Sequence, residues 1–422
     1  MTLSLASANR PLQGRVTLPG DKSLAHRAAL FAALAEGIST VRNYPDSGVT
    51  RAMRGALEAL GVPSRLEDGV LTLAGNGLRP FPRPGVVAWC GNSATTIRLL
   101  AGALAGTRSS AVLDGSAGLR KRPMGRIAEP LRLMGADVAT VDGRAPLTIS
   151  PAPLHGMDYT LPVASAQVKS CLELAALGAD APVTLHEPGP SRDHTARMFR
   201  AMGATVVSDG LTETVHPVTL LKPLDGTLPG DISSAAFLLA AAAIVPGSRV
   251  TVAGVGLNPT RTGVLDILSA MGARISTANP HTEFGEPVGD VTLEAAPLHG
   301  VEIAGDLVVR SIDEFPALAA VAAFAEGETV VRGAEELRYK ETDRIAAIVA
   351  QLGALGAEVV ERPDGFIVRG GTLKGGTARA NGDHRLAMSM ALCGLCAPVS
   401  VEGAEILNES FPEFEPLLSS LM

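Results

Sequence analysis

The chain is poor in aromatic residues and in positive charge, and both shortages exclude a class of protein. Aromatic side chains make up 3% of the 422 residues, and the formal net charge is −7. Proteins that bind nucleic acid usually carry a basic surplus, and those that bind single strands add aromatic stacking platforms. We therefore expect no nucleic-acid partner.

Cysteine and long apolar runs are also scarce. Four scattered cysteines are too few for a disulfide framework. Gly, Pro or a charged residue interrupts every apolar run before it could span a bilayer, and no dense basic block suits a membrane surface. Residues 1–16 do not read as a secretory signal. We expect a cytoplasmic protein with no membrane partner, and no metal at Cys393 and Cys396, which lack further Cys or His ligands nearby.

Small residues are abundant, and they occur in a long repeat. The segment LPGDKSLAHRAALFAALAEG at 18–37 returns at 228–247 as LPGDISSAAFLLAAAAIVPG. Similar helices are expected to start near Gly91, Ser165, Ile312 and Gly382, each followed by a short β-branched strand. In four repeats a second helix then closes on RLMGADV, RAMGATV, SAMGARI or GALGAEV, whose glycine fits a left-handed C-cap.

Six such repeats, each with a strand, a helix, a strand, a helix and further strands, predict an α/β protein. Grouped three and three, they predict two similar lobes with a cleft between them. The first helix of each repeat is apolar on most of its surface, so we expect it to be buried.

Polar side chains gather where these apolar helices begin. Helix N-termini present unpaired N–H groups and a partial positive charge, so they bind anions. Basic residues are disfavoured there by the helix dipole, and their presence indicates an anionic ligand. Taken singly, Ser23, Asn92, Ser165 and Asp383 are equally well explained as N-caps. Likewise, Glu341 and Arg344 suit a helical pair, and His26 suits a packing residue. Recurrence in five repeats favours binding.

Residues 14–23, GRVTLPGDKS, have some likeness to a P-loop. That motif needs Gly directly before the Lys, whereas Asp21 precedes Lys22 here. The spacing from Gly14 is also one residue too long. A P-loop kinase or ATPase is therefore a weak alternative.

The motifs GDKSLAHR, GNSATTIR, RKRP, ASAQVKS, IDEFP, KETDR and GDHR follow one another along the whole chain. Together they resemble the 5-enolpyruvylshikimate-3-phosphate (EPSP) synthase family. The resemblance implies two lobes, each of three βαβαββ units. One lobe is expected to be discontinuous, with residues 1–20 and 230–422, and the other to span 21–229.

The resemblance also implies an activity. Members of the family transfer the enolpyruvyl group of phosphoenolpyruvate to the 5-hydroxyl of shikimate 3-phosphate and release phosphate. This is a step of the shikimate pathway to chorismate and the aromatic amino acids. The reaction needs no metal and no organic cofactor. We further expect a monomer.

The site residues follow from the same resemblance. Shikimate 3-phosphate is expected to contact Lys22, Ser23, Arg27, Ser165, Ala166, Gln167, Arg192, Asp313 and Lys340. Phosphoenolpyruvate is expected to contact Lys22, Asn92, Ala94, Arg122, Gln167, Arg344 and Arg385. Arginine suits both ligands because its planar guanidinium binds phosphate and carboxylate in a bidentate manner. The expected catalytic groups are Asp313 for the hydroxyl proton, Lys22 for transfer and charge stabilisation, and Glu341 for the methylene proton.

Three positions depart from the commonest family pattern. Ala94 stands where many members have glycine, and its methyl group should intrude on a bulkier analogue of phosphoenolpyruvate. With ASAQVKS and IDEFP, this resembles the glyphosate-tolerant branch of the family, so we expect reduced glyphosate sensitivity. Glu336 replaces an Asn that contacts shikimate, and a Lys is replaced near Glu409.

Two further alternatives share the fold. UDP-N-acetylglucosamine enolpyruvyltransferase would need Lys-Asn in place of Lys22-Ser23. It would also need, as a rule, a reactive cysteine in the loop before Arg122, and GSAGLRKRP contains none. A catalytically silent binding protein would have no need for Lys22, Asp313 and Glu341 together.

Overall fold

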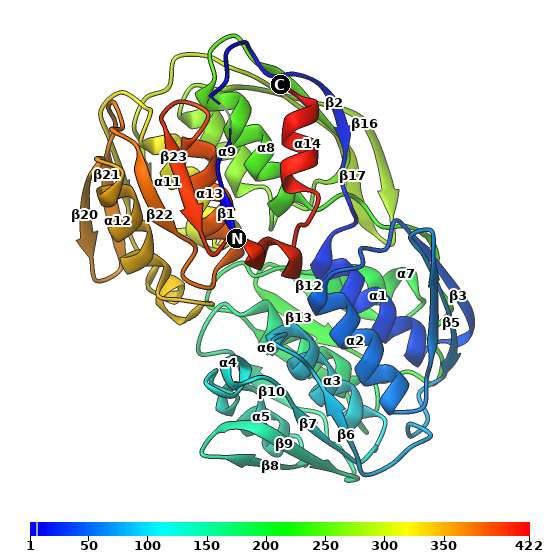
Figure 1. The fold of residues 1–422 in the computed structure, drawn as a ribbon. Coiled ribbons are helices and arrows are strands. Elements are labelled where there is room, and N and C mark those ends of the chain that lie inside the picture. Colours follow the sequence, from blue (N-terminus) through cyan, green and yellow to red (C-terminus); the bar gives the residue numbers. More distant parts are fainter. Residues whose placement is uncertain (6) are drawn as a thin grey trace. The chain divides into compact units, whose positions relative to one another are not determined.

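A computed structural model describes residues 1–5 and 7–422, and its contacts divide the chain into two compact units. We call Met1–Leu18, Gly230–His281 and Pro287–Met422 the terminal unit, because it holds both ends of the chain. The internal unit consists of Pro19–Pro229 with Thr282–Glu286. Both combine helices with small mixed sheets, as the predicted α/β class requires (Figure 1).

The internal unit forms four-stranded sheets with the orders β14-β3-β5-β4, β6-β7-β9-β8 and β10-β11-β13-β12. In each order the first pair is parallel and the other neighbours are antiparallel. The parallel pair requires a crossover and the antiparallel pair only a turn, which suits a βαβ unit followed by a hairpin.

The strands of the internal unit are β3 (Glu36–Arg42), β4 (Ser64–Glu67), β5 (Val70–Asn76), β6 (Val86–Trp89), β7 (Ala111–Asp114), β8 (Asp137–Val141), β9 (Arg144–Ser150), β10 (Asp158–Thr160), β11 (Val183–His186), β12 (Val206–Asp209), β13 (Thr212–Val215) and β14 (Asp225–Thr227). Its helices are α1 (Lys22–Leu34), α2 (Gly48–Ala59), α3 (Ala94–Gly106), α4 (Ala117–Arg120), α5 (Gly125–Leu133), α6 (Ala166–Ala176) and α7 (His194–Ala201).

The terminal unit forms sheets with the orders β16-β17-β15-β2, β18-β19-β21-β20 and β1-β23-β22. Their strands are β1 (Thr2–Leu3), β2 (Gln13–Thr17), β15 (Arg249–Gly256), β16 (Arg274–Glu283), β17 (Glu286–Glu294), β18 (Glu302–Ile303), β19 (Glu328–Val331), β20 (Glu358–Arg362), β21 (Gly365–Arg369), β22 (Gly376–Arg379) and β23 (Val399–Glu402). The helices are α8 (Ile232–Ile244), α9 (Gly263–Ala270), α10 (Asp306–Arg310), α11 (Phe315–Ala322), α12 (Arg344–Ala354), α13 (His384–Cys393) and α14 (Phe414–Ser420), with 3-10 turns η1 (Glu335–Tyr339) and η2 (Ala404–Glu409).

Two repeats take a strand from a distant part of the chain. The first repeat pairs β3 with β14, so that Thr40 lies opposite Asp225. The fourth repeat pairs β15 with β2, so that Val252 lies opposite Val16. The last repeat departs from the expected pattern, because it ends in α14 and its antiparallel strand is β1 from the start of the chain.

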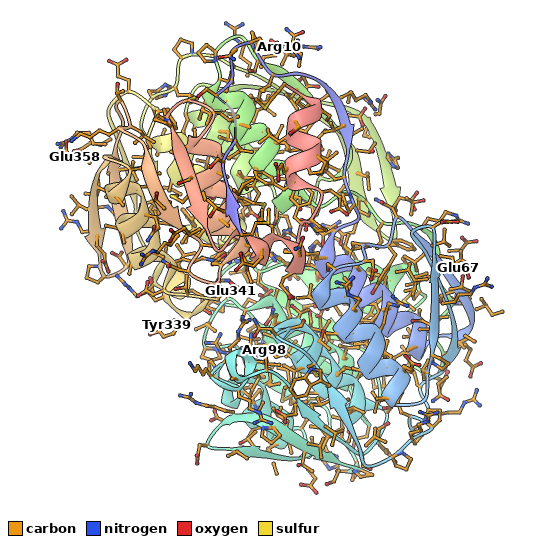
Figure 2. All side chains as sticks on the ribbon, viewed as in Figure 1. Arg10, Glu67, Arg98, Tyr339, Glu341 and Glu358 are labelled. Atoms are coloured by element: carbon orange, nitrogen blue, oxygen red, sulfur yellow. The ribbon has the colours of Figure 1, made fainter. Side chains whose placement is uncertain are left out.

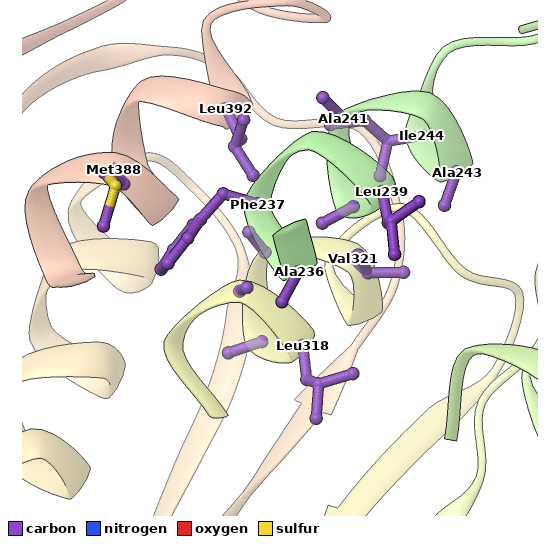
Figure 3. Packing of buried hydrophobic residues seen from close by; sticks show 14 of the residues in the cluster. Ala236, Phe237, Leu239, Ala241, Ala243, Ile244, Leu318, Val321, Met388 and Leu392 are labelled. Atoms are coloured by element: carbon purple, nitrogen blue, oxygen red, sulfur yellow. The ribbon is translucent and has the colours of Figure 1, made fainter. Parts of the chain in front are cut away.

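Helices predicted to be buried form the core of each unit. In the terminal unit α8, α11 and α13 pack together, and Figure 3 shows Phe237 of α8 extending towards α13, which carries Met388 and Leu392. Every side chain of α8 is buried, as its lack of charged residues predicts. In the internal unit α3 packs on both α1 and α6.

Close helix contact explains part of the glycine content. A Cβ atom on Gly102 of α3 would lie 2.0 Å from the carbonyl oxygen of Cys171 on α6. Real atoms do not approach so closely, so glycine is required there. The predicted left-handed C-cap glycines are confirmed as well, with positive φ at Gly135, Gly203, Gly272 and Gly356.

Candidate active site

The start of α1 is capped by a residue that the sequence did not single out. The carboxylate of Asp21 accepts a hydrogen bond from the backbone N–H of Leu24 at 2.9 Å. Ser23 is therefore not the N-cap, and the capping alternative for it is wrong. Lys22 and Ser23 form the first turn of α1, half-buried, where a ligand would meet the helix N-terminus.

His26 is a packing residue. Its Nδ1 donates to the carbonyl of Lys22 at 2.6 Å, and its Nε2 lies 3.1 Å from the Ser93 hydroxyl. Burial lowers the pKa of His26 to about 4, with smaller effects from its charged neighbours. The imidazole is therefore neutral at physiological pH, and it joins the start of α1 to the start of α3.

Arg27 is buried and held by hydroxyl groups. Its Nε donates to Thr195 Oγ1 at 2.8 Å, its Nη2 to Ser170 Oγ at 2.7 Å, and its Nη1 to the carbonyl of Ser23 at 3.0 Å. Burial lowers the pKa of Arg27 to about 10, and Arg192 also acts to lower it. Arg27 therefore keeps its charge at neutral pH and presents it beside the first turn of α1.

At the start of α3, as at the start of α1, the N-cap is a near neighbour of the residue that was considered from the sequence. Ser93 is the N-cap, and its Oγ accepts from the N–H of Thr96 at 3.1 Å. Asn92 instead accepts a hydrogen bond from the Ser116 hydroxyl at 2.9 Å. The capping alternative for Asn92 is therefore wrong. Ala94 is the first residue of the helix and is buried.

Gln167 is oriented from α3. Its Nε2 donates to Thr95 Oγ1 at 2.9 Å, and its Oε1 accepts from Arg98 Nη1. Arg98, labelled in Figure 2, also donates at 3.1 Å to the carbonyl of Pro123, the residue that follows Arg122 in the sequence. From the sequence Arg98 was given no role of its own. Its hydrogen bonds to Gln167 and Pro123 join α6 to the basic loop, which we define as residues 118–126.

Ser165 occupies the N-cap position of α6, but its side chain makes no capping hydrogen bond. Ala166 begins the helix next to it. Within the basic loop Arg120 pairs with Asp114, whereas Arg122 is half-buried. Arg192, also half-buried, precedes α7. The loop is thus partly used for internal ion pairing and not uniformly solvated.

A buried ionic group lies one turn beyond the start of α6. Lys169 Nζ lies 2.5 Å from Glu187 Oε1, and both side chains are almost fully buried. Burial raises the pKa of Glu173 well above its usual value, with the charge of Glu213 and a hydrogen bond to it adding to the effect. The raised pKa favours the neutral form of Glu173, and this shift, like the positive charge of Lys169, reduces the negative charge of the cluster.

In the terminal unit Arg344 is the centre of the polar cluster. Its guanidinium lies 2.7 Å from Asp383, 2.6 Å from Glu341 and 3.4 Å from Asp313, and its side chain is only 1% exposed. Burial alone would lower the pKa of Arg344, but Asp383, Glu341 and Asp313 raise it on balance. Glu341 and Arg344 do form an ion pair, but Glu341 precedes the N-cap Asp343 of α12, so the alternative of a helical pair is wrong and the contact is one part of a larger ionic cluster.

Asp313 is the point where several of these groups meet. Its Oδ1 lies 3.5 Å from Lys340 Nζ and 3.4 Å from Arg344 Nη1. Its backbone carbonyl accepts from Arg385 Nη1 at 3.0 Å. Asp383 caps α13 by accepting from the N–H groups of Arg385 and Leu386, which confirms that alternative for this residue. Glu341, labelled in Figure 2, is the more exposed partner of its ion pair, with 26% of its side chain exposed against 1% for Arg344.

Each unit therefore gathers its own share of the expected residues. Within the internal unit, Arg27 and Gln167 are held by polar partners, and within the terminal unit Asp313, Lys340, Glu341, Arg344 and Arg385 form a contiguous set. Of the three departures from the family pattern, Ala94 begins α3, Glu336 lies in η1, and Glu409 is exposed at the end of η2.

Glu314, which follows Asp313, was given no specific role from the sequence. It precedes α11, is completely buried, and lies 3.7 Å from Arg385. In the part of the chain that the structure describes, no group of three or more His, Cys, Asp or Glu side chains is placed to hold a metal ion. Among the described helices, none has the length and apolar character needed to cross a bilayer.

Comparison with known proteins gives consistent relatives. The model of the family described as EPSP synthase (3-phosphoshikimate 1-carboxyvinyltransferase) matches residues 7–418. The 3-phosphoshikimate 1-carboxyvinyltransferase of Syntrophomonas wolfei is 46% identical over 421 residues, which cover 98% of each chain. That of Roseiflexus castenholzii is 50% identical over 419 residues, which cover 96% of each chain.

Solved structures confirm the predicted fold. An EPSP synthase from Acinetobacter baumannii superposes with a TM-score of 0.90 at 40% identity, covering 100% of this chain and 98% of its own. The enolpyruvyl transferase NikO from Streptomyces tendae superposes with a TM-score of 0.78 at 22% identity, covering 99% of this chain and 96% of its own, and supports the fold alone. With a family model and relatives that match nearly its full length, the chain belongs to the EPSP synthase family.

Proposed function

We propose that this protein transfers the enolpyruvyl group of phosphoenolpyruvate to the 5-hydroxyl of shikimate 3-phosphate and releases phosphate. Family membership supports the reaction. The observation that carries it in the structure is the position of Asp313, whose carboxylate lies 3.5 Å from Lys340 and 3.4 Å from Arg344. The two cations favour the ionised form of this carboxylate even next to anionic ligands, and only the ionised form can accept a proton.

The two substrates require many cationic contacts, because each carries a phosphate and a carboxylate. We assign shikimate 3-phosphate to Lys22, Ser23, Arg27, Ser165, Ala166, Gln167, Arg192, Asp313 and Lys340. We assign phosphoenolpyruvate to Lys22, Asn92, Ala94, Arg122, Gln167, Arg344 and Arg385. Support comes from the rigid hydrogen-bonding of Arg27 and Gln167 and from the buried ion pairs of Arg344. Side chains that are already held in place lose little freedom when they bind a ligand.

The chemistry has an addition and an elimination. In the addition, the 5-hydroxyl oxygen bonds to C2 of phosphoenolpyruvate, the hydroxyl loses its proton, and the methylene carbon gains one. In the elimination, that methyl group loses a proton, the carbon–carbon double bond forms again, and phosphate leaves. Asp313 takes the hydroxyl proton in this proposal. Lys22 stabilises the developing charge, and Glu341 exchanges the proton of the methylene carbon.

Reduced glyphosate sensitivity is part of the proposal. Ala94 is buried at the first position of α3, so its methyl group has little room to move. A bulkier analogue of phosphoenolpyruvate would meet this methyl group, whereas the smaller substrate would not. Tight inhibition by glyphosate, competitive with phosphoenolpyruvate, would contradict this part.

The first experiment is phosphate release by the purified protein, with each substrate added alone and both together. Release only when both are present would support the transferase. Binding of both ligands without release would favour the silent binding protein. Release with UDP-N-acetylglucosamine in place of shikimate 3-phosphate would favour the sister enzyme, although the loop before Arg122 contains no cysteine.

We also propose that the protein acts in the reducing cytoplasm and that it is a monomer. The four thiols are unpaired, and those of Cys90, Cys171 and Cys393 are buried. Burial raises the pKa of each of these three thiols to about 12, so they stay protonated and unreactive at neutral pH. Light scattering at working concentration tests the monomer.

A further inference from the structure

The fourth repeat contributes a row of buried polar side chains, linked by hydrogen bonds and an ion pair, for which the sequence suggested no role. We call this row, which consists of Asp231, Arg261, Ser233, Glu314 and Arg385, the polar chain. Its helix α8 begins with GDIS, the counterpart of GDKS at the start of α1. Asp231 caps α8 by accepting from the N–H of Ser233 at 2.9 Å. The hydroxyl of Ser233, the equivalent of Ser23 in the repeat, donates to Glu314 Oε1.

Arg261 completes this chain at its far end. Its Nη2 donates to Ser233 Oγ at 2.8 Å and lies 3.3 Å from Asp231 Oδ1. Asp231, Ser233 and Arg261 are each at most 3% exposed, so their contacts are shielded from water. With its oxygen accepting from Arg261, the Ser233 hydroxyl hydrogen points towards Glu314.

Glu314 connects the Ser233 hydroxyl to Arg385. Its carboxylate is completely buried, and Oε1 lies 3.7 Å from Arg385 Nη1. That same Nη1 donates to the carbonyl of Asp313 at 3.0 Å. A buried carboxylate without a counter-charge is costly, so Glu314 and Arg385 hold each other in place.

We propose that Glu314, held by Ser233 and Arg261, is a positioning residue that orients Arg385 towards the anionic groups of phosphoenolpyruvate. The inference rests on the proposed function for the identity of the ligand. The charges alternate along the chain from Asp231 to Arg261, then through the Ser233 hydroxyl to Glu314 and Arg385. Glu314 is completely buried, so its effect comes through the position in which it holds the guanidinium of Arg385.

The test compares two adjacent serines of α8. Ser233→Ala removes the hydroxyl that binds Glu314, whereas Ser234→Ala removes a buried hydroxyl from the same helix outside this chain. Glu314→Gln keeps the size and the acceptor oxygen but removes the charge. Steady-state kinetics in each variant give kcat and the KM of each substrate, and thermal melting gives the stability.

We expect KM for phosphoenolpyruvate to rise about fivefold in Ser233→Ala and about tenfold in Glu314→Gln, because the carboxylate that forms an ion pair with Arg385 is less well held or loses its charge. The KM for shikimate 3-phosphate should change less than about twofold in both. Ser234→Ala should behave as the unaltered protein. A lower melting temperature with an unchanged KM for phosphoenolpyruvate would show a merely structural role and overturn the proposal.

Crystal structures of Ser233→Ala, Ser234→Ala and Glu314→Gln make the test independent of turnover. If the unaltered protein released no phosphate, the proposed function would fail while the positioning could still be judged. Displacement of the Arg385 guanidinium from the Asp313 carbonyl in Ser233→Ala, but not in Ser234→Ala, is the expected result. An unmoved guanidinium in Ser233→Ala and in Glu314→Gln would overturn it.

Discussion

Single buried side chains decide how this protein presents charge. Arg27 and Arg344 are both buried, yet each keeps its positive charge because hydroxyls or carboxylates surround it. Water cannot reorient such groups, so the geometry that they have without ligand is the geometry with which they would meet an anion. Three predictions follow from individual residues.

Asp313 gives the first. Asp313→Asn should lower kcat by at least about 100-fold with a smaller change in either KM, because the amide cannot accept the hydroxyl proton. Initial rates of phosphate release at varied concentrations of both substrates measure this. Asp306→Asn, which alters an exposed carboxylate of the same unit, is the control. If only KM rose, Asp313 would be a binding group and not the base.

Ala94 gives the second. Ala94→Gly should lower the inhibition constant for glyphosate by about tenfold or more, since one methyl group in a tight pocket discriminates at this level. The KM for phosphoenolpyruvate should move much less. Competition assays at several substrate concentrations provide both values. Equal inhibition of the variant and the unaltered protein would place the methyl group away from the ligand.

His26 gives the third, on stability against pH. Its pKa is about 4 when folded and 6.5 when unfolded, so between these values the unfolded chain binds one more proton. The free energy of unfolding should therefore fall as pH decreases from about 6.5 to about 4, by about 3 kcal/mol from this group. Urea titrations across this range, compared with His26→Gln, measure the share of His26. If the free energy of unfolding of His26→Gln had the same pH dependence as that of the unaltered protein, His26 would not be the cause.

At the scale of the helices, closeness of packing determines which small residues are replaceable. Gly102→Ala would bring a Cβ atom to 2.0 Å from the Cys171 carbonyl and force α3 and α6 apart. We expect a loss of about 3 kcal/mol in the free energy of unfolding. Gly55→Ala is the matched change, because Gly55 is exposed in α2 with nothing within 4 Å of its added Cβ. It should gain about 0.5–1 kcal/mol, as expected for alanine in an open helix. Denaturant unfolding compares them, and similar values would contradict the account.

The sequence predicted the positions of helices and strands better than the side-chain contacts that they make. The repeated LPGD and MGA phrases marked helix starts and C-cap glycines, because both depend on local backbone chemistry. The N-caps at Asp21 and Ser93 lay one or two residues from the positions considered. Capping depends on which oxygen reaches back to the N–H groups, and several polar neighbours compete for that position.

Long-range partners were beyond sequence reasoning. Arg261 lies 28 residues from Ser233, and Glu314 lies 81 residues from it. No local sequence pattern distinguishes a buried Glu from an exposed one. In IDEFP a role was therefore predicted for Asp313 and none for the adjacent Glu314. Tertiary packing alone brings these groups together, and so the role of the fourth repeat was missed.

For the molecule as a whole, the prediction concerns the start of the chain. Deleting residues 1–17 would remove β2 from the edge of β15 and uncover the site of Leu12 and Val16, which are buried. The terminal unit should lose about 3–6 kcal/mol from these two side chains alone. Deleting only residues 1–5 removes the two-residue β1 and should cost far less. Thermal melting and gel filtration compare the two deletions, and equal stability would argue against β2 as an integral strand.

The position of β14 also sets an order of events during synthesis. The sheets of the second and third repeats are complete once residues 86–150 and 158–215 have been made. The sheet of the first repeat, although it begins earliest, lacks its outer strand until Asp225–Thr227 emerges from the ribosome. Domains fold as their segments become available. The first-made repeat of the internal unit is therefore the last one there to close its sheet, and nascent chains stalled before residue 225 should leave β3 exposed as an open edge.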